Sequence, residues 1–216
     1  MDILFILPIY TKDRKYDIVG TYLLSTLLVQ NNISSKILYY FQEDFLNKPF
    51  NKFIIDYTDL ILSYKPKIVS LYLIADSTYI QLRLAQELKA KDPTLTIISG
   101  GPQATLLQEK LLQFSADIDY ICCGEGETTI VPLCSSILEG RVDLTIPGLA
   151  YRSAKEFKVN PQAELLPSNY QLPLDIYIAS DLLVDAKYIN ENNISIGFDV
   201  GRGCIGRCAF CSSEEV

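Results

Sequence analysis

Short apolar runs alternate with stretches of helical spacing along the first 140 residues. The runs are rich in Ile, Leu and Val and lack a polar face, which is typical of strands covered on both sides. Between them, apolar residues recur three or four positions apart, as Val19, Leu23 and Leu27 do, and this spacing predicts amphipathic helices. The predicted strands cover 2–7, 35–41, 67–74, 94–99 and 117–123, and the predicted helices cover 50–64, 77–90, 105–114 and 127–138 after a first helix that includes 19–28.

Five strand–helix units in a row predict an α/β fold with a doubly wound parallel sheet. Right-handed crossovers leave few arrangements of such a sheet, and five strands favour the flavodoxin-like order 2-1-3-4-5. Ligands of these sheets bind beyond the carboxyl ends of the strands. We therefore expect the site in the loops that follow the first, third, fourth and fifth strands.

The pattern changes after Gly140. The run 146–152, a polar turn and the stretch 157–160 predict a small hairpin, and 161–192 reads as a proline-containing linker with one short helix at 181–188. A new strand at 193–200 then leads directly into a group of cysteines. The expected organisation is a Rossmann-like domain at 1–140, a hairpin and linker at 141–192, and the start of another domain at 193–216.

Composition and charge restrict the possible partners. A chain of 216 residues with 49% apolar and 21% charged residues can build a core without disulfides. Its net charge of -7 argues against sequence-independent binding to the phosphate backbone of nucleic acids. The start MDILFILPIY has neither a basic region nor the length of a signal peptide or membrane span. We expect a cytoplasmic protein with small-molecule or protein partners.

The chain contains no histidine, which excludes Ser-His-Asp and Cys-His catalysis and any imidazole ligand to a metal. Its cysteines are therefore the main candidates for metal chemistry. Cys204, Cys208 and Cys211 have the spacing C-x3-C-x2-C among small residues, so their thiolates can converge on one inorganic centre. A structural zinc site completed elsewhere, or thiols with no shared role, remain the alternatives. The other three cysteines, Cys122, Cys123 and Cys134, are predicted to pack in the core.

The segment GCIGRCAFC after a predicted strand resembles the signature of the radical S-adenosylmethionine (radical SAM) enzymes. The resemblance implies that Cys204, Cys208 and Cys211 hold a 4Fe-4S cluster. In that family the iron without a protein ligand chelates S-adenosylmethionine, which is cleaved to a 5′-deoxyadenosyl radical. The main chain beside Phe210 is expected near the adenine.

Two glycine-containing loops follow the fourth and fifth predicted strands, SGGPQAT at 99–105 and GEGETT at 124–129. Glycines at such positions let the backbone and a helix start approach a ligand, although tight turns alone would also need them. Thr129 stands where a dinucleotide fingerprint requires glycine or alanine, so an NAD site is not expected. The expected cofactor-binding residues are Gly100, Gly101, Pro102, Gln103, Ala104, Gly124, Glu125, Gly126 and Glu127.

Taken in order, GGPQAT, DIDYICCGEGE and IPGLAYR resemble the cobalamin-binding domain of cobalamin-dependent radical SAM enzymes, and the likeness covers nearly the whole chain. Gln103 stands where many relatives have histidine, and the DxHxxG element of other cobalamin proteins is absent. The resemblance therefore implies cobalamin bound with no protein imidazole on cobalt.

The resemblance implies that the chain is the amino-terminal part of a cobalamin-dependent radical SAM enzyme, and we expect this enzyme to be a methyltransferase acting on an unactivated carbon. The alternative is a non-catalytic cobalamin- or nucleotide-binding module whose cysteine tail holds a cluster or metal for electron transfer or sensing. In the family the cluster loop follows the first strand of a β/α barrel, and only that strand is present. We therefore expect a truncated chain, an interrupted reading frame or half of a split enzyme, inactive without its missing barrel segment or partner chain.

Overall fold

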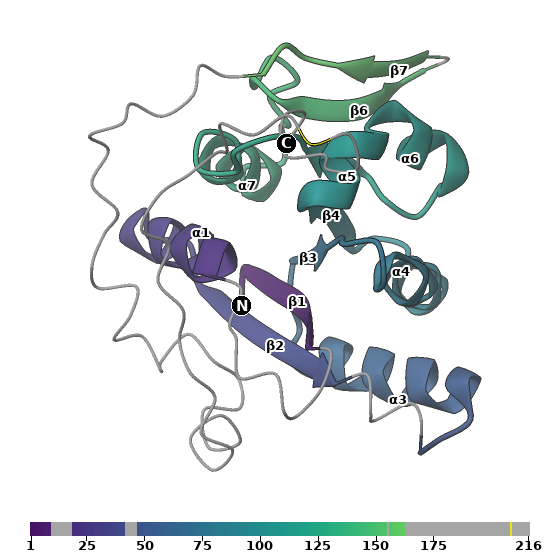
Figure 1. Ribbon diagram of the computed structural model, residues 1–216. Helices are drawn as coiled ribbons and strands as arrows, with labels where there is room; N and C mark the ends of the chain where they lie inside the picture. Colours follow the sequence, from purple (N-terminus) through teal and green to yellow (C-terminus); the bar gives the residue numbers. More distant parts are fainter. Residues whose placement is uncertain (10–18, 42–46, 155, 163–207, 209–216) are drawn as a thin grey trace.

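The computed structural model describes residues 1–9, 19–41, 47–154, 156–162 and 208, in which helices cover both faces of one sheet (Figure 1). The strands are β1 (Ile3–Ile9), β2 (Ser35–Phe41), β3 (Ile68–Tyr72), β4 (Thr96–Gly100), β5 (Tyr120–Cys122), β6 (Leu149–Ser153) and β7 (Glu156–Val159). The helices are α1 (Val19–Gln30), α3 (Phe50–Ser63), α4 (Thr78–Lys91), α5 (Pro102–Leu107), α6 (Glu109–Phe114) and α7 (Ile130–Leu138).

The strand order is β2-β1-β3-β4-β5-β6-β7. Strands β1 to β5 pair in parallel, so the order 2-1-3-4-5 predicted for the first five strands is found. The prediction of a sheet with only five strands is wrong. The hairpin continues the same sheet, because β6 pairs antiparallel with β5, placing Leu149 opposite Cys122, and β7 pairs antiparallel with β6.

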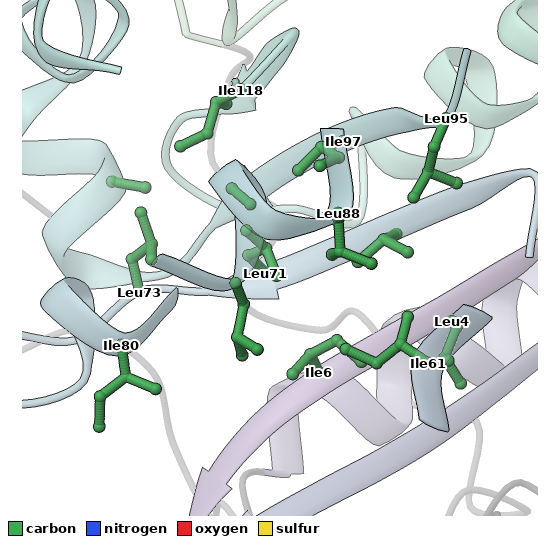
Figure 2. Close-up of a cluster of buried hydrophobic side chains, with 14 of the residues drawn as sticks. Leu4, Ile6, Ile61, Leu71, Leu73, Ile80, Leu88, Leu95, Ile97 and Ile118 are labelled. Carbon is green, nitrogen blue, oxygen red and sulfur yellow. The ribbon is translucent and has the colours of Figure 1, made fainter. Parts of the chain in front are cut away.

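The sheet separates two apolar layers because successive side chains on a strand point to opposite faces. On β1, Leu4 and Ile6 pack in one core cluster with α3 and α4, as Figure 2 shows, whereas Ile3, Phe5 and Leu7 pack in another with α1 and α7. All five side chains are at most 3% exposed. Full burial of each contributes roughly 1.5–3 kcal/mol, which explains why the strand has no polar face.

The helix predicted at 105–114 is two short helices instead of one. The first begins earlier, at Pro102, because proline fits the first turn of a helix and Gly101 supplies the preceding turn. The two helices meet at Gln108, whose φ of 44° is incompatible with a continuous α-helix. Nothing in the residue types around Gln108 predicts this break.

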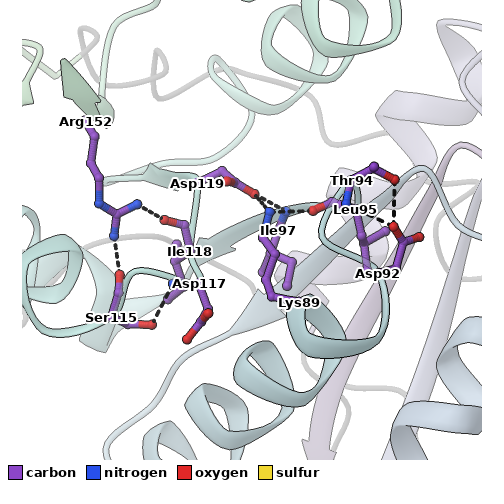
Figure 3. Close-up of polar contacts among 10 residues, drawn as sticks. All are labelled: Lys89, Asp92, Thr94, Leu95, Ile97, Ser115, Asp117, Ile118, Asp119 and Arg152. Carbon is purple, nitrogen blue, oxygen red and sulfur yellow. Dashed lines mark hydrogen bonds and ion pairs between the residues drawn. The ribbon is translucent and has the colours of Figure 1, made fainter. Parts of the chain in front are cut away.

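Arg152 of β6 fastens the hairpin to the rest of the domain (Figure 3). Its guanidinium donates hydrogen bonds to the carbonyl oxygens of Leu112, Ser115 and Ile118, at the end of α6 and in the approach to β5. Nearby, the Asp119 carboxylate accepts from the Ile97 backbone amide at 2.7 Å and pairs with Lys89 at 2.8 Å. These contacts lie where β4 and β5 begin, away from the carboxyl ends of the parallel strands.

The predicted short helix at 181–188 and the strand at 193–200 lie outside the described residues. Within the part of the chain that the structure describes, no helix is both long and apolar enough to span a membrane.

Candidate cofactor-binding site

The parallel strands β1 to β5 all end at one side of the sheet, which we call the carboxyl edge. Strand β1 pairs with β3 only as far as Ile6 opposite Leu71. Beyond that point β1 continues beside β2 up to Ile9, while Tyr72 of β3 pairs with Gly100 of β4. The strands therefore separate between β1 and β3, which is the topological switch point where sheets of this order bind ligands.

A turn at Gly100–Gln103, the glycine turn, follows β4 at this edge. Gly101 has φ +95°, and a Cβ atom there would lie 2.8 Å from the Leu73 carbonyl oxygen and 3.0 Å from the Tyr72 ring. Only glycine fits this position. The Leu73 amide donates to the Gly100 carbonyl at 2.8 Å, and the Gln103 amide donates to the Leu73 carbonyl at 3.1 Å, so the turn is locked to the end of β3.

The residues around this turn differ in exposure. Gly100 is partly exposed, and a Cβ atom there would have only Cys122 within 4 Å. Ala104 is 0% exposed and packs in the core, so it anchors the residue that follows the glycine turn. Ser99 is 1% exposed, and its hydroxyl has no hydrogen-bond partner among the described residues. An unpaired buried hydroxyl costs about 1–3 kcal/mol, so a ligand or water that reached Ser99 would recover that free energy.

The loop 124–129, which we call the acidic loop, lies beside the glycine turn. The Gly124 amide donates to the Thr105 hydroxyl at 3.0 Å, so a direct hydrogen bond joins the two predicted loops. The Ile130 amide donates to the Gly126 carbonyl at 2.8 Å as the chain enters α7, and a Cβ atom on Gly126 would lie 3.0 Å from the Leu24 side chain of α1. The structure therefore brings together the two segments predicted to bind a cofactor.

Residues after β7 complete this part of the carboxyl edge, and the sequence analysis missed them. The side-chain amide of Asn160 donates to the carbonyls of Leu144 and Ile146, at 2.9 and 2.7 Å. Gln162 lies against Gly124, where a Cβ atom would be 3.2 Å from the Gln162 side chain. Asn160 falls in the predicted hairpin and Gln162 in the predicted linker, and neither was predicted to lie at the site. An open depression of about 640 Å³ is lined by Leu144, Thr145, Pro147, Tyr151, Asn160, Pro161 and Gln162.

The three core cysteines behave as predicted. Cys122, Cys123 and Cys134 are at most 6% exposed, and none forms a disulfide. Burial raises the pKa of Cys123 to about 11 and that of Cys134 to about 12, and burial beside Cys134 raises the pKa of Cys122 as well. These thiols stay protonated at neutral pH and are poor metal ligands.

Of the three cysteines predicted to hold a cluster, only Cys208 is among the described residues, and it is exposed. Cys204, Cys211 and Phe210 lie outside them. Within the described residues, no group of three His, Cys, Asp or Glu side chains is arranged to hold a metal ion. The arrangement of the cysteine motif therefore stays a prediction.

The chain is similar to several methyltransferases and a cyclase, although no family model matches it. The chain is 28% identical over 160 residues to an uncharacterized methyltransferase of Pyrococcus horikoshii, covering 74% of this chain and 34% of that protein. It is 33% identical over 137 residues to an anaerobic magnesium-protoporphyrin IX monomethyl ester cyclase of Synechocystis, covering 61% and 26%. It is 25% identical over 136 residues to the cobalamin-dependent radical SAM methyltransferase TokK of Streptomyces tokunonensis, covering 61% and 20%.

Solved structures share the fold. The cobalamin-dependent S-adenosylmethionine radical enzyme OxsB, with aqua-cobalamin and S-adenosylmethionine bound, matches with a TM-score of 0.67 and 18% identity over 98% of this chain and 28% of its own. The radical S-adenosylmethionine methyltransferase TsrM of Kitasatospora setae, with cobalamin and a 4Fe-4S cluster bound, matches with a TM-score of 0.57 and 16% identity, over 80% and 31%.

The chain spans about a third or less of the length of each of these proteins. The family resemblance predicted from the sequence is confirmed: the chain is similar to proteins described as cobalamin-dependent radical SAM enzymes, among them TokK and OxsB.

Proposed function

We propose that this chain is the corrinoid-binding part of a cobalamin-dependent radical SAM methyltransferase. The observation that carries the proposal is the glycine turn, which is held against the end of β3 beside the switch point and is joined through Thr105 to the acidic loop. The proteins named above support it, because the Pyrococcus horikoshii protein, TokK and TsrM are described as methyltransferases, and OxsB and TsrM are described with cobalamin bound.

The residues at the carboxyl edge fit a corrinoid. A broad, flat ligand needs backbone that it can approach closely, and Gly100 leaves such a place because little protein stands beside it. The unpaired Ser99 hydroxyl offers a buried hydrogen-bonding group next to it. The absence of histidine fits cobalamin bound without a protein imidazole on cobalt. Gly100, Gly101, Pro102, Gln103 and the acidic loop Gly124–Glu127 would hold the group, with Ala104 packed beneath.

When bound, cobalamin would supply the methyl-transfer chemistry. The chain's own residues would hold and orient it. Gly101 and Leu73 keep the turn rigid, and the bond from the Gly124 amide to Thr105 fixes the distance between the two loops. A rigid cradle loses little conformational entropy on binding, which favours a preorganised site.

The cysteine motif completes the proposal. Cys204, Cys208 and Cys211 would hold the 4Fe-4S cluster that binds S-adenosylmethionine, with the main chain beside Phe210 near the adenine. Residues 193–216 would then belong to the radical SAM domain, and 1–140 with the hairpin to the corrinoid-binding domain. Methyl transfer is preferred to ring closure because more of the proteins named above are described as methyltransferases, although the magnesium-protoporphyrin IX monomethyl ester cyclase keeps ring closure as a second candidate.

Two measurements on the purified chain test these assignments. Titration with hydroxocobalamin should change the corrinoid absorption spectrum in a saturable manner with one corrinoid per chain. Anaerobic reconstitution with iron and sulfide should give a 4Fe-4S spectrum that is lost in C204A, C208A and C211A but retained in C134A, whose thiol lies in the core. A chain that binds neither corrinoid nor iron would refute the proposal.

The reaction is tested with a radical SAM barrel segment supplied on the same or a second chain. We expect 5′-deoxyadenosine from S-adenosylmethionine in that assembly and none from the 216-residue chain alone. A methylated product would support the methyltransferase, whereas a cyclised product without an added methyl group would favour the second candidate.

A further inference from the structure

Gln81 is a polar side chain placed in the apolar layer beneath the switch point. It lies in the first turns of α4 and is 0% exposed, and its neighbours Ile80, Leu84 and Ala85 belong to the apolar core cluster. Its side-chain nitrogen donates hydrogen bonds to the carbonyl oxygens of Ile6 and Tyr72, both at 3.2 Å. Because carbonyl oxygens only accept hydrogen bonds, the amide orientation of Gln81 is fixed by these two partners.

The two carbonyls belong to the two strands that separate at the switch point. Ile6 is the last residue of β1 that pairs with β3, and Tyr72 is the last residue of β3. The amide nitrogen carries two hydrogens, one for each carbonyl, so Gln81 bridges β1 and β3 where their direct pairing ends. It therefore sets how far apart the strands stand at the point where a ligand would enter.

The same bridge connects to the glycine turn. Tyr72 is followed by Leu73, which exchanges backbone hydrogen bonds with Gly100 and Gln103. A Cβ atom on Gly101 would lie 2.8 Å from the Leu73 carbonyl oxygen, so the glycine turn is packed tightly against Leu73. A shift of Tyr72 by a few tenths of an ångström would therefore move the turn as well.

Stability alone does not explain Gln81. Its side-chain oxygen is buried and has no hydrogen-bond partner among the described residues. A buried acceptor without a partner is unfavourable, and an apolar side chain of similar size would avoid it at this position. The amide is useful only through its two N–H groups and the strands that they hold.

We propose that Gln81 is a positioning residue for the corrinoid site. It acts through the carbonyls of Ile6 and Tyr72, sets the separation of β1 and β3, and aligns the glycine turn with the ligand. This inference rests on the proposed corrinoid function and adds to it a residue on α4, outside the loops predicted from the sequence.

The test compares four variants with the wild-type chain. Q81M keeps the length and removes both donors, and Q81N keeps the amide but is one methylene too short to bridge both carbonyls. Q86M changes an exposed glutamine on the same helix. L88A removes a fully buried side chain near the end of α4, next to Lys89, which pairs with Asp119 just before β5. It therefore lowers the stability of the fold at a distance from the switch point.

Binding of hydroxocobalamin is measured by absorption titration, and unfolding is measured by far-ultraviolet circular dichroism. The circular dichroism induced in the corrinoid bands reports the orientation of the bound corrinoid. We expect Q81M to raise the Kd about tenfold or more, Q81N to raise it less, and both to alter the induced spectrum at saturation. Q86M and L88A should keep the wild-type Kd and spectrum, even though L88A lowers the unfolding midpoint.

The outcomes distinguish the proposed corrinoid binding from the role of Gln81 in it. If the wild-type chain binds no corrinoid, the proposed function fails and Gln81 has no ligand to position. If the wild-type chain binds and Q81M and Q81N bind equally well, the proposed function stands and this inference is overturned. Equal losses in Q81M and L88A would also overturn it, because Gln81 would then act through stability alone.

Discussion

A methyl group added to a glycine can destabilise a fold by straining the backbone or by colliding with a neighbouring atom. Three glycines of this chain allow these two effects to be measured separately. Gly101 has φ +95° and ψ 173°, a region open almost only to glycine, and an added Cβ would lie 2.8 Å from the backbone oxygen of Leu73. Gly140 also has a positive φ, +76°, but nothing within 4 Å of its Cβ position. Gly20 lies in α1 and likewise has nothing within 4 Å.

The free energies follow from this geometry. G20A should stabilise the chain by about 0.5 kcal/mol, because alanine loses less backbone entropy in a helix. G140A should destabilise it by about 1–2 kcal/mol through backbone strain alone. G101A adds a collision to strain of about 1–3 kcal/mol, and since the Leu73 carbonyl is held by Gln103 and cannot retreat, we expect a total loss of about 3 kcal/mol or more.

Urea unfolding followed by far-ultraviolet circular dichroism measures all three variants under the same conditions. The expected order of unfolding free energy is G20A, wild type, G140A and G101A, from highest to lowest. If G101A lost no more than G140A, the contact between the glycine turn and β3 would be loose, and the description of this turn as a rigid cradle would be wrong.

Three further predictions concern other parts of the chain. R152M should lower the free energy of unfolding by about 2–3 kcal/mol, because it leaves three backbone carbonyls without their charged donor. A urea unfolding curve identical to that of the wild type would contradict this role of Arg152. Cys123 and Cys134 should resist thiol reagents at pH 8 until the chain is unfolded, since burial raises their pKa to about 11 and 12; mass spectrometry after labelling detects any early modification. The Asp2 carboxylate accepts hydrogen bonds from Lys67 and Ser34, which lower its pKa from 3.8 to about 2. The wild type should therefore be more stable than D2N above pH 4, and this difference in unfolding free energy should disappear as the pH falls through 2. A difference that stays constant with pH would refute this prediction.

The sequence predicted the strands well because their burial on both faces leaves a local mark. The range 35–41 agrees with β2 residue for residue, and the other parallel strands differ at their ends only. The two glycine loops were also found, since a strand that passes into a helix through glycine is visible locally. Their contact through Thr105 and Gly124 needed the structure, because the two residues lie 19 positions apart.

The remaining features depend on contacts over long separations. The hairpin joins the sheet through pairing with β5 and through Arg152, whose partners lie 34 to 40 positions away, and the residue pattern of a hairpin is the same whether or not it adds to a sheet. Gln81 read as one polar residue on an amphipathic helix, and its partner Ile6 lies 75 positions earlier. Such a bridge between strands has no local signal.

The chemistry of the carboxyl edge favours a corrinoid over a polyphosphate nucleotide. The groups gathered there are glycine backbone, the hydroxyls of Ser99 and Thr105 and the carboxamide of Gln162, and the charges in the adjacent loop are the carboxylates of Glu125 and Glu127. A nucleotide with two or three phosphates needs cations or a helix N-terminus without carboxylates beside it, whereas α5 has only six residues and α7 begins directly after the loop that carries Glu125 and Glu127. A corrinoid has many neutral amides around its ring, which pair with hydroxyls, carbonyls and carboxylates. Cobalamin carries a single phosphodiester, whereas adenosine triphosphate carries several negative charges close together. The carboxylates of the acidic loop would therefore repel the triphosphate far more strongly and would accept hydrogen bonds from corrin amides, so adenosine triphosphate should not compete with hydroxocobalamin for the chain.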